Sequence, residues 1–536
     1  MLHTLNDNSS DQLFKNEPLT DFSIRENREL FGKTLRVLKE QVESNPLKSI
    51  PIVDGEELPS DVVVARENPA NPEQILGRVH YARIANARLA LKKLKEYAPQ
   101  WEAVSYKQRA KIISAVAELM RQKKLELASL MVLECGKPWR ESDADVAEAI
   151  DFCDYYAQEM LRIGEPRTMG NALGEINQYF YQPRGIVSVI SPWNFPLAIT
   201  AGMTTAALVT GNVVALKPAE QSSLIAAELV KILFEAGLPQ QALAFLPGKG
   251  EQIGAELVSA SETDMICFTG SGEVGLQIIE KAAKVRPQQK GIKRVVAEMG
   301  GKNAIIVDED ADLDEAIKGV IYSSFGFAGQ KCSACSRVIV VGSAYEPFIE
   351  RFSEACKDVV IGDPFEPATL VGPLIDMEAK KNVLEKIEQY RAEHEIAFEG
   401  EHIEPGYFIA PTVFRDVPFK SFLWETELFA PVVACTSAKD FEEALMLANR
   451  SKYALTGALF SRSPKNIEQA TKQFKVGNLY INRGSTGALV YRQAFGGFKL
   501  SGVGSKAGGP DYLVQFMEPR VITENTMRRG FAPELT

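Results

Sequence analysis

The chain has 536 residues, of which 45% are apolar and 24% are charged. At roughly 150 residues per domain, this length predicts about three or four structural units. The globular composition argues against extensive disorder, and the net charge of −10 excludes the basic footprint of a dedicated nucleic-acid binder. These values favour a soluble protein with a small-molecule partner and no nucleic-acid partner.

The chain carries seven cysteines and four histidines. An odd number of cysteines, spread over so long a chain, does not suggest a disulfide framework. We therefore expect a reducing compartment, the cytoplasm. The N-terminal residues lack the apolar core of a secretory signal. None of the histidines has the spacing of a zinc site, and we expect no metal.

One uncharged run, Gly185–Leu216, is long enough to suggest a transmembrane helix. Prolines, glycines and asparagines interrupt this run, and such residues break a helix or add polar groups to it. We therefore interpret the run as a buried part of a folded domain and expect no membrane partner.

The predicted elements begin with helices. Residues 1–48 are polar and partly helical, with a periodic run over Phe31–Val42, and they predict an N-terminal helical arm. Residues 51–72 are rich in turns and short strands. Helical periodicity then covers residues 84–97, 106–135 and 142–162. Ser142 and Asp145 resemble a cap at the start of the last of these helices.

From Gly185 onward, strands alternate with helices. The first set contains the apolar runs GIVSVIS, NVVALKP, ALAFLPG, MICFTG and RVVAEMG. Helical runs at 222–236 and 273–284 separate some of these strands. A second set begins at NAIIVDED, continues with a helix at 313–325 and a strand at 337–341, and ends near residues 479–483. This alternation predicts βαβ units, parallel sheets and two α/β domains.

A glycine-rich turn suggests nucleotide binding. Gly270, Gly272 and Gly275 form a GxGxxG pattern between a predicted strand and a predicted helix, which is the context of a dinucleotide fingerprint. An ordinary strand–helix turn is the alternative. In the simple fingerprint, the acidic ribose ligand ends the next strand, and this would be Glu298.

Lys217 and Glu220 follow another predicted strand. Ligands bind at the carboxyl ends of strands in open α/β sheets. A carboxylate there can accept hydrogen bonds from ribose hydroxyls and would repel a 2′-phosphate. A solvated pair of loop charges is an equally open interpretation.

Cys332 lies in a glycine-flanked segment beside Lys331. Glycines permit a substrate to approach closely, and a neighbouring cation favours the reactive thiolate. Cys332 and Cys335 also form a CxxC pattern, which is weak evidence for zinc and leaves a redox disulfide open. Inert burial is the commoner outcome for a single cysteine.

Two further residues could support chemistry at a carbonyl group. Asn194 stands between Pro192 and Pro196, and these rigid neighbours would make its amide a suitable donor to an oxyanion. Glu298 ends a predicted strand before two glycines and could act as a general base. In both cases a purely structural hydrogen bond is the alternative.

Each motif is weak alone, but their order is specific. The chain contains, in succession, SPWNFP, LKPAEQS, FTGSGEVG, AEMGGKN, GQKCS, ETELFAPV and FGGFKLSG. Over nearly its whole length, this series resembles the aldehyde dehydrogenase superfamily. Within it, the chain is similar to the branch of L-glutamate γ-semialdehyde (1-pyrroline-5-carboxylate) dehydrogenases, as judged from NEPLTDF, ADVAEAIDF, SSFGFAGQKCSACSR, INRGSTGAL and GGFKLSGVGSKAGGPDYL.

The resemblance implies catalytic and cofactor roles. It makes Cys332 the nucleophile, Asn194 the oxyanion donor, and Glu298 the general base instead of a ribose ligand. It also implies NAD as cofactor, bound by Lys217, Glu220, Gly270, Ser271, Glu427 and Phe429. Leu428 and Ala430 stand where the family more often has isoleucine and glycine, which affects only local packing at the cofactor.

The resemblance also implies a set of substrate contacts near the C-terminus and around the nucleophile. These residues are Ser333, Gly487, Ala488, Phe195, Phe495 and Glu148. In this set, the two phenylalanines flank the aliphatic chain, and Glu148 helps to meet an ammonium group. A solvated helix face is the alternative for Glu148.

The implied reaction is NAD-dependent oxidation of L-glutamate 5-semialdehyde to L-glutamate in proline catabolism, through a cysteine thiohemiacetal and a thioester. Two alternatives stay open, namely another semialdehyde substrate and a non-catalytic structural relative. The implied fold is α/β, with a Rossmann-like NAD-binding domain (49–167 and 185–296) and an α/β catalytic domain (297–486). A small β oligomerisation element (168–184 and 487–536) implies at least a homodimer.

Overall fold

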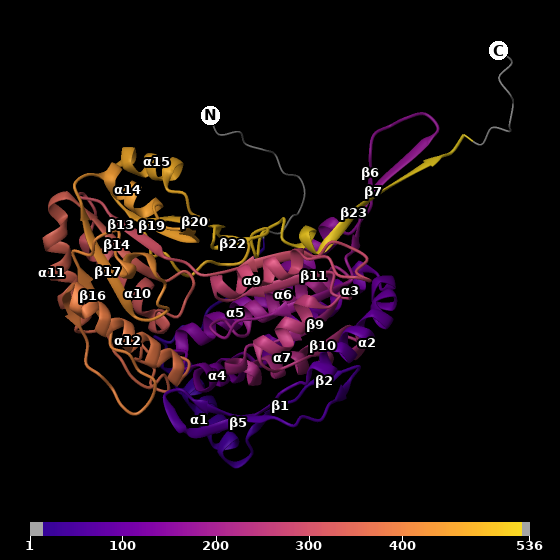
Figure 1. The fold of residues 1–536 in the computed structure, drawn as a ribbon, viewed down its shortest axis with the longest axis horizontal. Coiled ribbons are helices and arrows are strands. Elements are labelled where there is room, and N and C mark those ends of the chain that lie inside the picture. Colours follow the sequence, from indigo (N-terminus) through magenta and orange to yellow (C-terminus); the bar gives the residue numbers. More distant parts are fainter. Residues whose placement is uncertain (1–13, 528–536) are drawn as a thin grey trace.

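The computed structural model describes residues 14–527. Figure 1 shows two lobes side by side, with a thin arm that extends away from the first lobe. Each lobe has its own sheet and its own hydrophobic core. This arrangement confirms the expected α/β class, with two large α/β units and a small β element.

The first lobe is built on an eight-stranded sheet with the order β22-β12-β11-β8-β9-β10-β2-β3. Its parallel centre comprises β8 (Ile186–Ile190), β9 (Val213–Lys217), β10 (Leu243–Phe245), β11 (Met265–Thr269) and β12 (Arg294–Glu298). Its antiparallel edges are β2 (Ile52–Val53), β3 (Glu56–Glu57) and β22 (Gly502–Val503). Every residue of β8 and β9 is buried, as expected for strands covered on both faces.

Helices surround this first sheet. They are α1 (Arg25–Ser44), α2 (Ile84–Ala103), α3 (Tyr106–Gln122), α4 (Lys124–Cys135), α5 (Trp139–Ile163), α6 (Ala198–Val209), α7 (Ser223–Glu235), α8 (Ala255–Ser259) and α9 (Gly272–Ala283). The uncharged run from residue 185 to residue 216 therefore folds as β8, α6 and β9. Among the described helices, none is long and apolar enough to cross a membrane.

Two local expectations are corrected. The helical run 106–135 is two helices, interrupted at Lys123. The predicted cap at Ser142 and Asp145 is wrong, because α5 already begins at Trp139, after Pro138. Asp145 is instead fully buried inside α5, where its carboxylate serves tertiary contacts described below.

The second lobe is built on a seven-stranded sheet with the order β15-β16-β17-β14-β13-β19-β20. Its strands are β13 (Asn303–Val307), β14 (Cys335–Val341), β15 (Glu395–Glu399), β16 (Thr412–Arg415), β17 (Val432–Ala438), β19 (Thr456–Phe460) and β20 (Asn478–Ile481). The helices of this lobe are α10 (Leu313–Phe325), α11 (Tyr345–Cys356), α12 (Met377–Glu393), α13 (Phe422–Glu425), α14 (Phe441–Asn449) and α15 (Pro464–Gln473).

Three small sheets complete the fold. One contains β1 (Leu47–Ser49), β4 (Val63–Asn68) and β5 (Asn71–His80), and another pairs β18 (Tyr453–Ala454) with β21 (Phe498–Lys499). The third is the arm, with β6 (Arg167–Thr168), β7 (Glu175–Pro183) and β23 (Met517–Asn525). All nine residues of β7 pair with β23, so the 175–183 region and the C-terminal segment belong to one sheet.

One predicted domain boundary, between residues 296 and 297, falls inside β12. Glu298 ends this strand, and β12 pairs with β11 of the first sheet. Glu298 therefore belongs to the sheet of the first lobe, although the predicted boundary places it in the catalytic domain.

Candidate active site

Several predicted site residues lie at one edge of the first sheet. Glu298 ends β12, Gly270 follows β11, Asn194 follows β8, and Lys217 ends β9. These four strands are neighbours and parallel, so their carboxyl ends meet at the same edge, where ligands bind in such sheets. The backbone N–H of Gly270 donates to the carbonyl oxygen of Glu298 at 3.1 Å, which joins two of these ends directly.

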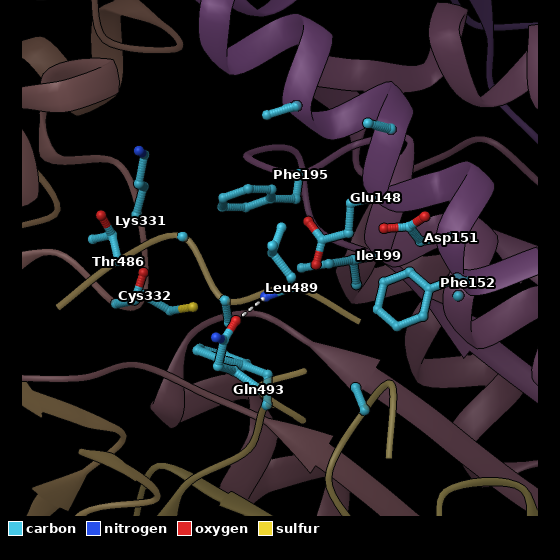
Figure 2. Close-up of a pocket in the computed structure, with 18 of the residues that line it drawn as sticks. Glu148, Asp151, Phe152, Phe195, Ile199, Lys331, Cys332, Thr486, Leu489 and Gln493 are labelled. Carbon is cyan, nitrogen blue, oxygen red and sulfur yellow. Dashed lines mark hydrogen bonds between the residues drawn. The ribbon is translucent and has the colours of Figure 1, made fainter. Parts of the chain in front are cut away.

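A cavity of about 390 Å³ lies beside this edge. Its lining includes eight of the predicted residues, namely Cys332, Glu298, Ser333, Gly487, Ala488, Phe195, Phe495 and Glu148. Figure 2 shows the side chains of Phe195 and Glu148 on one side of this space and Cys332 on another. The structure thus brings together residues separated by more than three hundred positions in the sequence.

The loop that carries Cys332 is held in place by amide side chains. Asn303 Nδ2 donates to the carbonyl oxygens of Cys332 and Ala334 at 2.7 and 2.8 Å. Asn194 Nδ2 donates to the carbonyl oxygen of Gln330 at 3.1 Å. The predicted oxyanion donor therefore already contacts the loop that carries Cys332, and its amide retains a second hydrogen to donate.

Cys332 is half-buried, whereas the other six cysteines are buried. Burial raises the pKa of Cys332 well above its ordinary value, and the carboxylates of Glu427, Glu298 and Glu148 raise it further. The expectation that Lys331 favours the thiolate is wrong. Its ammonium group lies 2.7 Å from Glu141 Oε1, and Figure 2 shows its side chain directed away from Cys332.

The neighbouring Cys335 is buried, and its thiol donates to the carbonyl oxygen of Arg337 at 3.4 Å. Burial raises the pKa of Cys335 to about 11. Within residues 14–527, no three His, Cys, Asp or Glu side chains are grouped as the ligands of a metal ion would be.

Glu298 has the environment of a proton acceptor. Its Oε2 atom is buried and has no hydrogen-bond partner among residues 14–527. Burial raises the pKa of Glu298 to about 8, and the Lys506 ammonium group opposes this rise. A carboxyl group with such a pKa changes protonation near physiological pH, which suits a general base.

The loop that carries Asn194 is fixed by an ion pair that sequence reasoning missed. Lys137 Nζ lies 2.7 Å from Asp145 Oδ2, and it donates to the carbonyl oxygen of Asn194 at 2.8 Å. Asp145 Oδ1 accepts from the backbone N–H of Ala198 at 2.7 Å. Both charged side chains are fully buried, and the Lys137 ammonium lies 4.2 Å from the centre of the Phe195 ring. The pair thus holds this loop at its middle, through Asn194, and at the start of α6, through Ala198.

Replacing Lys137 with methionine is expected to lower the free energy of unfolding by about 3–5 kcal/mol, because Asp145 becomes a buried carboxylate without its partner. Urea unfolding followed by circular dichroism measures this loss. The matched control is Lys107→Met, whose exposed ion pair with Glu165 should contribute less than about 1 kcal/mol. Equal stability of the two variants would contradict a structural role for the buried pair.

The predicted ribose-binding residues lie together at the end of β9. Lys217 Nζ is 3.1 Å from Glu220 Oε1, and the same oxygen accepts from the backbone N–H of Gly250 at 2.7 Å. Burial lowers the pKa of Lys217, and Glu220 opposes this effect. The space beside Gly250 is open, since a Cβ atom added there would meet nothing closer than 3.9 Å. A carboxylate next to unoccupied space at the Gly250 backbone suits the binding of a ribose.

The glycine-rich turn begins a genuine helix. Ser271 caps the N-terminus of α9, where its hydroxyl accepts from the backbone N–H of Val274 at 3.4 Å. Such a helix terminus, with its free N–H groups, favours the phosphates of a dinucleotide. The strand–turn–helix context predicted for GxGxxG is confirmed.

Glu427 and Phe429 are far from Cys332 in the sequence, but they line a small pocket together with Lys331 of its loop. Glu427 Oε1 accepts from the backbone N–H of Gly301 at 2.9 Å. Burial raises the pKa of Glu427 to about 7. The Phe429 ring packs edge-on against Trp193, with 5.5 Å between the ring centres, so these residues adjoin the Asn194 loop.

The C-terminal loop that lines the cavity is hydrogen-bonded to the segment that carries Cys332. Ser485 Oγ donates to the carbonyl oxygen of Ser333 at 3.2 Å. Arg483 Nη2 donates to the carbonyl oxygens of Thr486 and Gly487 at 3.0 and 3.1 Å. Gly487 has a φ of 76°, a conformation that favours glycine. The side chain of Gln493 accepts from the Leu489 N–H at 3.0 Å, as Figure 2 shows.

Glu148 faces the cavity from α5, so the alternative of a solvated helix face is wrong. Burial raises the pKa of Glu148 to about 8, and the nearby Asp145 adds to the effect. Sequence reasoning missed Asp151, which lines the same cavity one helical turn later. A spacing of three residues on a helix places both carboxylates on one face, so the sequence could have predicted that Asp151 lies beside Glu148.

Comparisons with known proteins agree with this geometry. A model described as the aldehyde dehydrogenase family matches residues 58–522. The 1-pyrroline-5-carboxylate dehydrogenase of Geobacillus sp. (strain WCH70) is similar, with 46% identity over 96% of this chain and 99% of that protein. The 1-pyrroline-5-carboxylate dehydrogenase of Bacillus subtilis (strain 168) is 44% identical over 95% and 99% of the two chains.

Solved structures are similar over the same extent. The 1-pyrroline-5-carboxylate dehydrogenase from Thermus with bound NAD is 42% identical, with a TM-score of 0.93 over 96% of this chain and 100% of that one. Proline utilization A (PutA) from Bdellovibrio bacteriovorus is 48% identical, with a TM-score of 0.95. This alignment covers 97% of the present chain and 54% of PutA, so the chain spans about half of that longer protein.

Proposed function

Because the chain belongs to the aldehyde dehydrogenase family, we propose that it oxidises L-glutamate 5-semialdehyde to L-glutamate with NAD, a step of proline catabolism. The observation that carries this proposal is a single cavity lined by Cys332, Glu298 and Glu148. These side chains offer a nucleophile, a base and a carboxylate for a substrate ammonium group. The names of the relatives compared above support the same substrate.

In the proposed reaction, a base removes the Cys332 proton, and the sulfur attacks the aldehyde carbon to form a thiohemiacetal. The negative oxygen of this intermediate accepts hydrogen bonds from the Asn194 amide and the Cys332 backbone N–H. Bound NAD supplies the oxidising chemistry by accepting hydride from that carbon. A thioester on Cys332 remains.

Glu298 completes the cycle by hydrolysis. Its carboxylate takes a proton from water, and the water oxygen attacks the thioester carbon. The carbon–sulfur bond then breaks, which releases L-glutamate and returns Cys332. The partnerless Oε2 atom is available for this proton.

The cofactor proposal assigns the adenosine ribose to Lys217 and Glu220. The pyrophosphate would lie near Gly270 and Ser271 at the N-terminus of α9. Glu427 and Phe429 would hold the nicotinamide ribose and ring. The open backbone at Gly250 beside Glu220 fits a ribose. We propose NAD over NADP because the Glu220 carboxylate would repel a 2′-phosphate.

The substrate proposal assigns the amino-acid end to the C-terminal loop. The backbone N–H groups of Gly487 and Ala488, with Ser333, would bind the carboxylate. Glu148 would meet the ammonium group, whose charge favours the ionised form of Glu148. The aliphatic chain would lie between Phe195 and Phe495.

The assembly proposal is a homodimer or higher oligomer, built through the arm of β6, β7 and β23. This arm projects from the first lobe (Figure 1) and exposes Ile176 and Val521. We retain as a proposal the division into helical, NAD-binding, catalytic and oligomerisation units, with cytoplasmic localisation. The seven free cysteines support a reducing compartment.

Substrate preference tests the proposed function. We expect kcat/KM for 1-pyrroline-5-carboxylate, in equilibrium with its semialdehyde, to exceed that for propanal by at least about a hundredfold. A site that binds polar groups rejects a substrate lacking them. NADH formation, measured by absorbance with NAD and with NADP, provides the readout. A preference for succinic semialdehyde would support the alternative of another semialdehyde substrate. Inactivity on every aldehyde would support the alternative of a non-catalytic structural relative.

A further inference from the structure

A short N-terminal segment lies against the wall of the proposed substrate cavity. We call this segment, residues 14–20, the N-terminal strap. It contains most of the NEPLTDF motif, to which the proposed chemistry assigns no role. Glu17 and Leu19 of the strap line the same cavity as Cys332. The strap therefore adjoins the site, although more than three hundred residues separate it from the nucleophile.

The strap is fastened to α5 by buried carboxylates. The backbone N–H of Glu17 donates to Asp151 Oδ1 at 2.6 Å. The backbone N–H of Thr20 donates to Asp143 Oδ2 at 2.7 Å. Both aspartates are almost fully buried, with exposed fractions of 3% and 1%. Hydrogen bonds to charged, buried groups are stronger than neutral ones, so these contacts give the strap a defined position.

Asn16 connects α5 with the C-terminal loop. Its Nδ2 atom donates to Asp151 Oδ2 at 2.7 Å and to the carbonyl oxygen of Val490 at 2.9 Å. Val490 follows Gly487 and Ala488 by only three and two residues. One amide group thus spans from the helix that carries Glu148 to the loop proposed to bind the substrate carboxylate.

An aromatic cluster makes the same connection independently. The Phe14 ring lies 5.3 Å from the Tyr155 ring of α5 and 5.9 Å from the Tyr491 ring of the loop, measured between ring centres. Tyr155 and Tyr491 also contact each other at 5.6 Å. Tyr491 has a φ of 69°, which costs free energy for a residue other than glycine and requires support from its surroundings.

We propose that the N-terminal strap is a positioning element for substrate recognition, in which Asn16 sets the distance between α5 and the loop at residues 487–493. This inference rests on the proposed function. The loop and α5 would bind opposite ends of the same amino-acid group, so their separation determines how well that group fits. Asn16 touches neither the reacting atoms nor the cofactor site, and it acts through Val490 and Asp151.

The test compares Asn16→Ala with wild type. We expect KM for L-glutamate 5-semialdehyde and the inhibition constant of L-glutamate to rise by about tenfold, the scale of losing a hydrogen bond to a charged partner. The KM for NAD and kcat/KM for propanal should stay within about twofold, because propanal has no amino-acid group. The matched control is Asn27→Ala, because Asn27 is a partly exposed asparagine that donates to the carbonyl oxygen of Asp21, away from the cavity lining.

A second variant separates hydrogen bonding from shape. Asn16→Asp keeps the shape of the side chain, but an ionised carboxylate has no hydrogen to donate and would face Asp151. It should therefore weaken L-glutamate inhibition at least as much as Asn16→Ala. Wild-type inhibition constants in either variant would overturn the proposal. Equal losses on propanal and the semialdehyde, with a lowered Tm, would also overturn it in favour of a purely structural strap.

The outcomes distinguish this inference from the proposed function on which it rests. If wild type shows no preference for the semialdehyde over propanal and no inhibition by L-glutamate, the proposed function fails. If wild type shows both properties and the Asn16 variants retain them unchanged, only the positioning role of the strap fails.

Discussion

Replacing Cys332 with alanine is expected to lower kcat for NADH formation by at least about a thousandfold, a conservative figure for the loss of a catalytic nucleophile. Without the sulfur, no thiohemiacetal can form. The substrate then has no activated carbon from which hydride can be transferred. Steady-state NADH formation with the semialdehyde measures the effect. NAD binding followed by protein fluorescence should be retained, which would show that the variant is folded.

Cys335→Ala is the matched control for this variant. Cys335 belongs to the same CxxC pattern but is buried, and its thiol donates to a backbone carbonyl. Its activity should stay within about threefold of wild type, since a buried structural cysteine behaves as a small apolar side chain. Appreciable turnover by Cys332→Ala, or loss of turnover confined to Cys335→Ala, would contradict the assignment of the nucleophile.

Replacing Glu298 with glutamine is expected to lower kcat by roughly a hundredfold to ten-thousandfold, the range for general acid–base catalysis. Hydride transfer precedes hydrolysis in the proposed sequence, so the first turnover should still occur. Rapid-mixing measurements should therefore show a burst of about one NADH per active site, followed by slow turnover. Cys332→Ala should show no burst. A Glu298→Gln variant with wild-type steady-state turnover would exclude Glu298 as the base.

The pH dependence of the wild-type enzyme follows from the same residue. Because burial raises the pKa of Glu298 to about 8, the carboxylate form needed to accept a proton increases as the pH rises through this value. We expect kcat to increase over that interval and this rise to be lost in Glu298→Gln. The interval from pH 6 to pH 9 is roughly the span around such a pKa. A wild-type kcat that stays constant over this interval would contradict a titrating base.

The order of elements and the identity of the main motifs could be predicted from local patterns. The buried strands at β8 and β9 are continuous apolar runs, and the helix at 313–325 has the bounds that its periodicity predicts. Such features depend on neighbouring residues, so they are readable along the chain. The motif series also carried the family resemblance, because the order of several weak signals is far more specific than any one of them.

Local patterns failed where a side chain is used by a distant segment. Asp145 looked like a helix cap, but its carboxylate binds Lys137 and Ala198. Lys331 looked like a cation that activates Cys332, but Glu141 neutralises it. The sequence shows which residues are charged, whereas packing determines which residue each of them contacts. That contact decides how the charge changes the pKa of a neighbouring group.

The reactive groups of this protein and its fold class are readable along the chain, since periodicity and motif order are properties of neighbouring residues. Which of these groups lie close together depends on the packing of distant segments. This packing brought Cys332, Glu298 and Glu148 to one cavity and raised the pKa of each by burial. It also placed Asn16 between α5 and a loop 474 positions away. Distances between remote segments and their burial depend on how the whole chain packs.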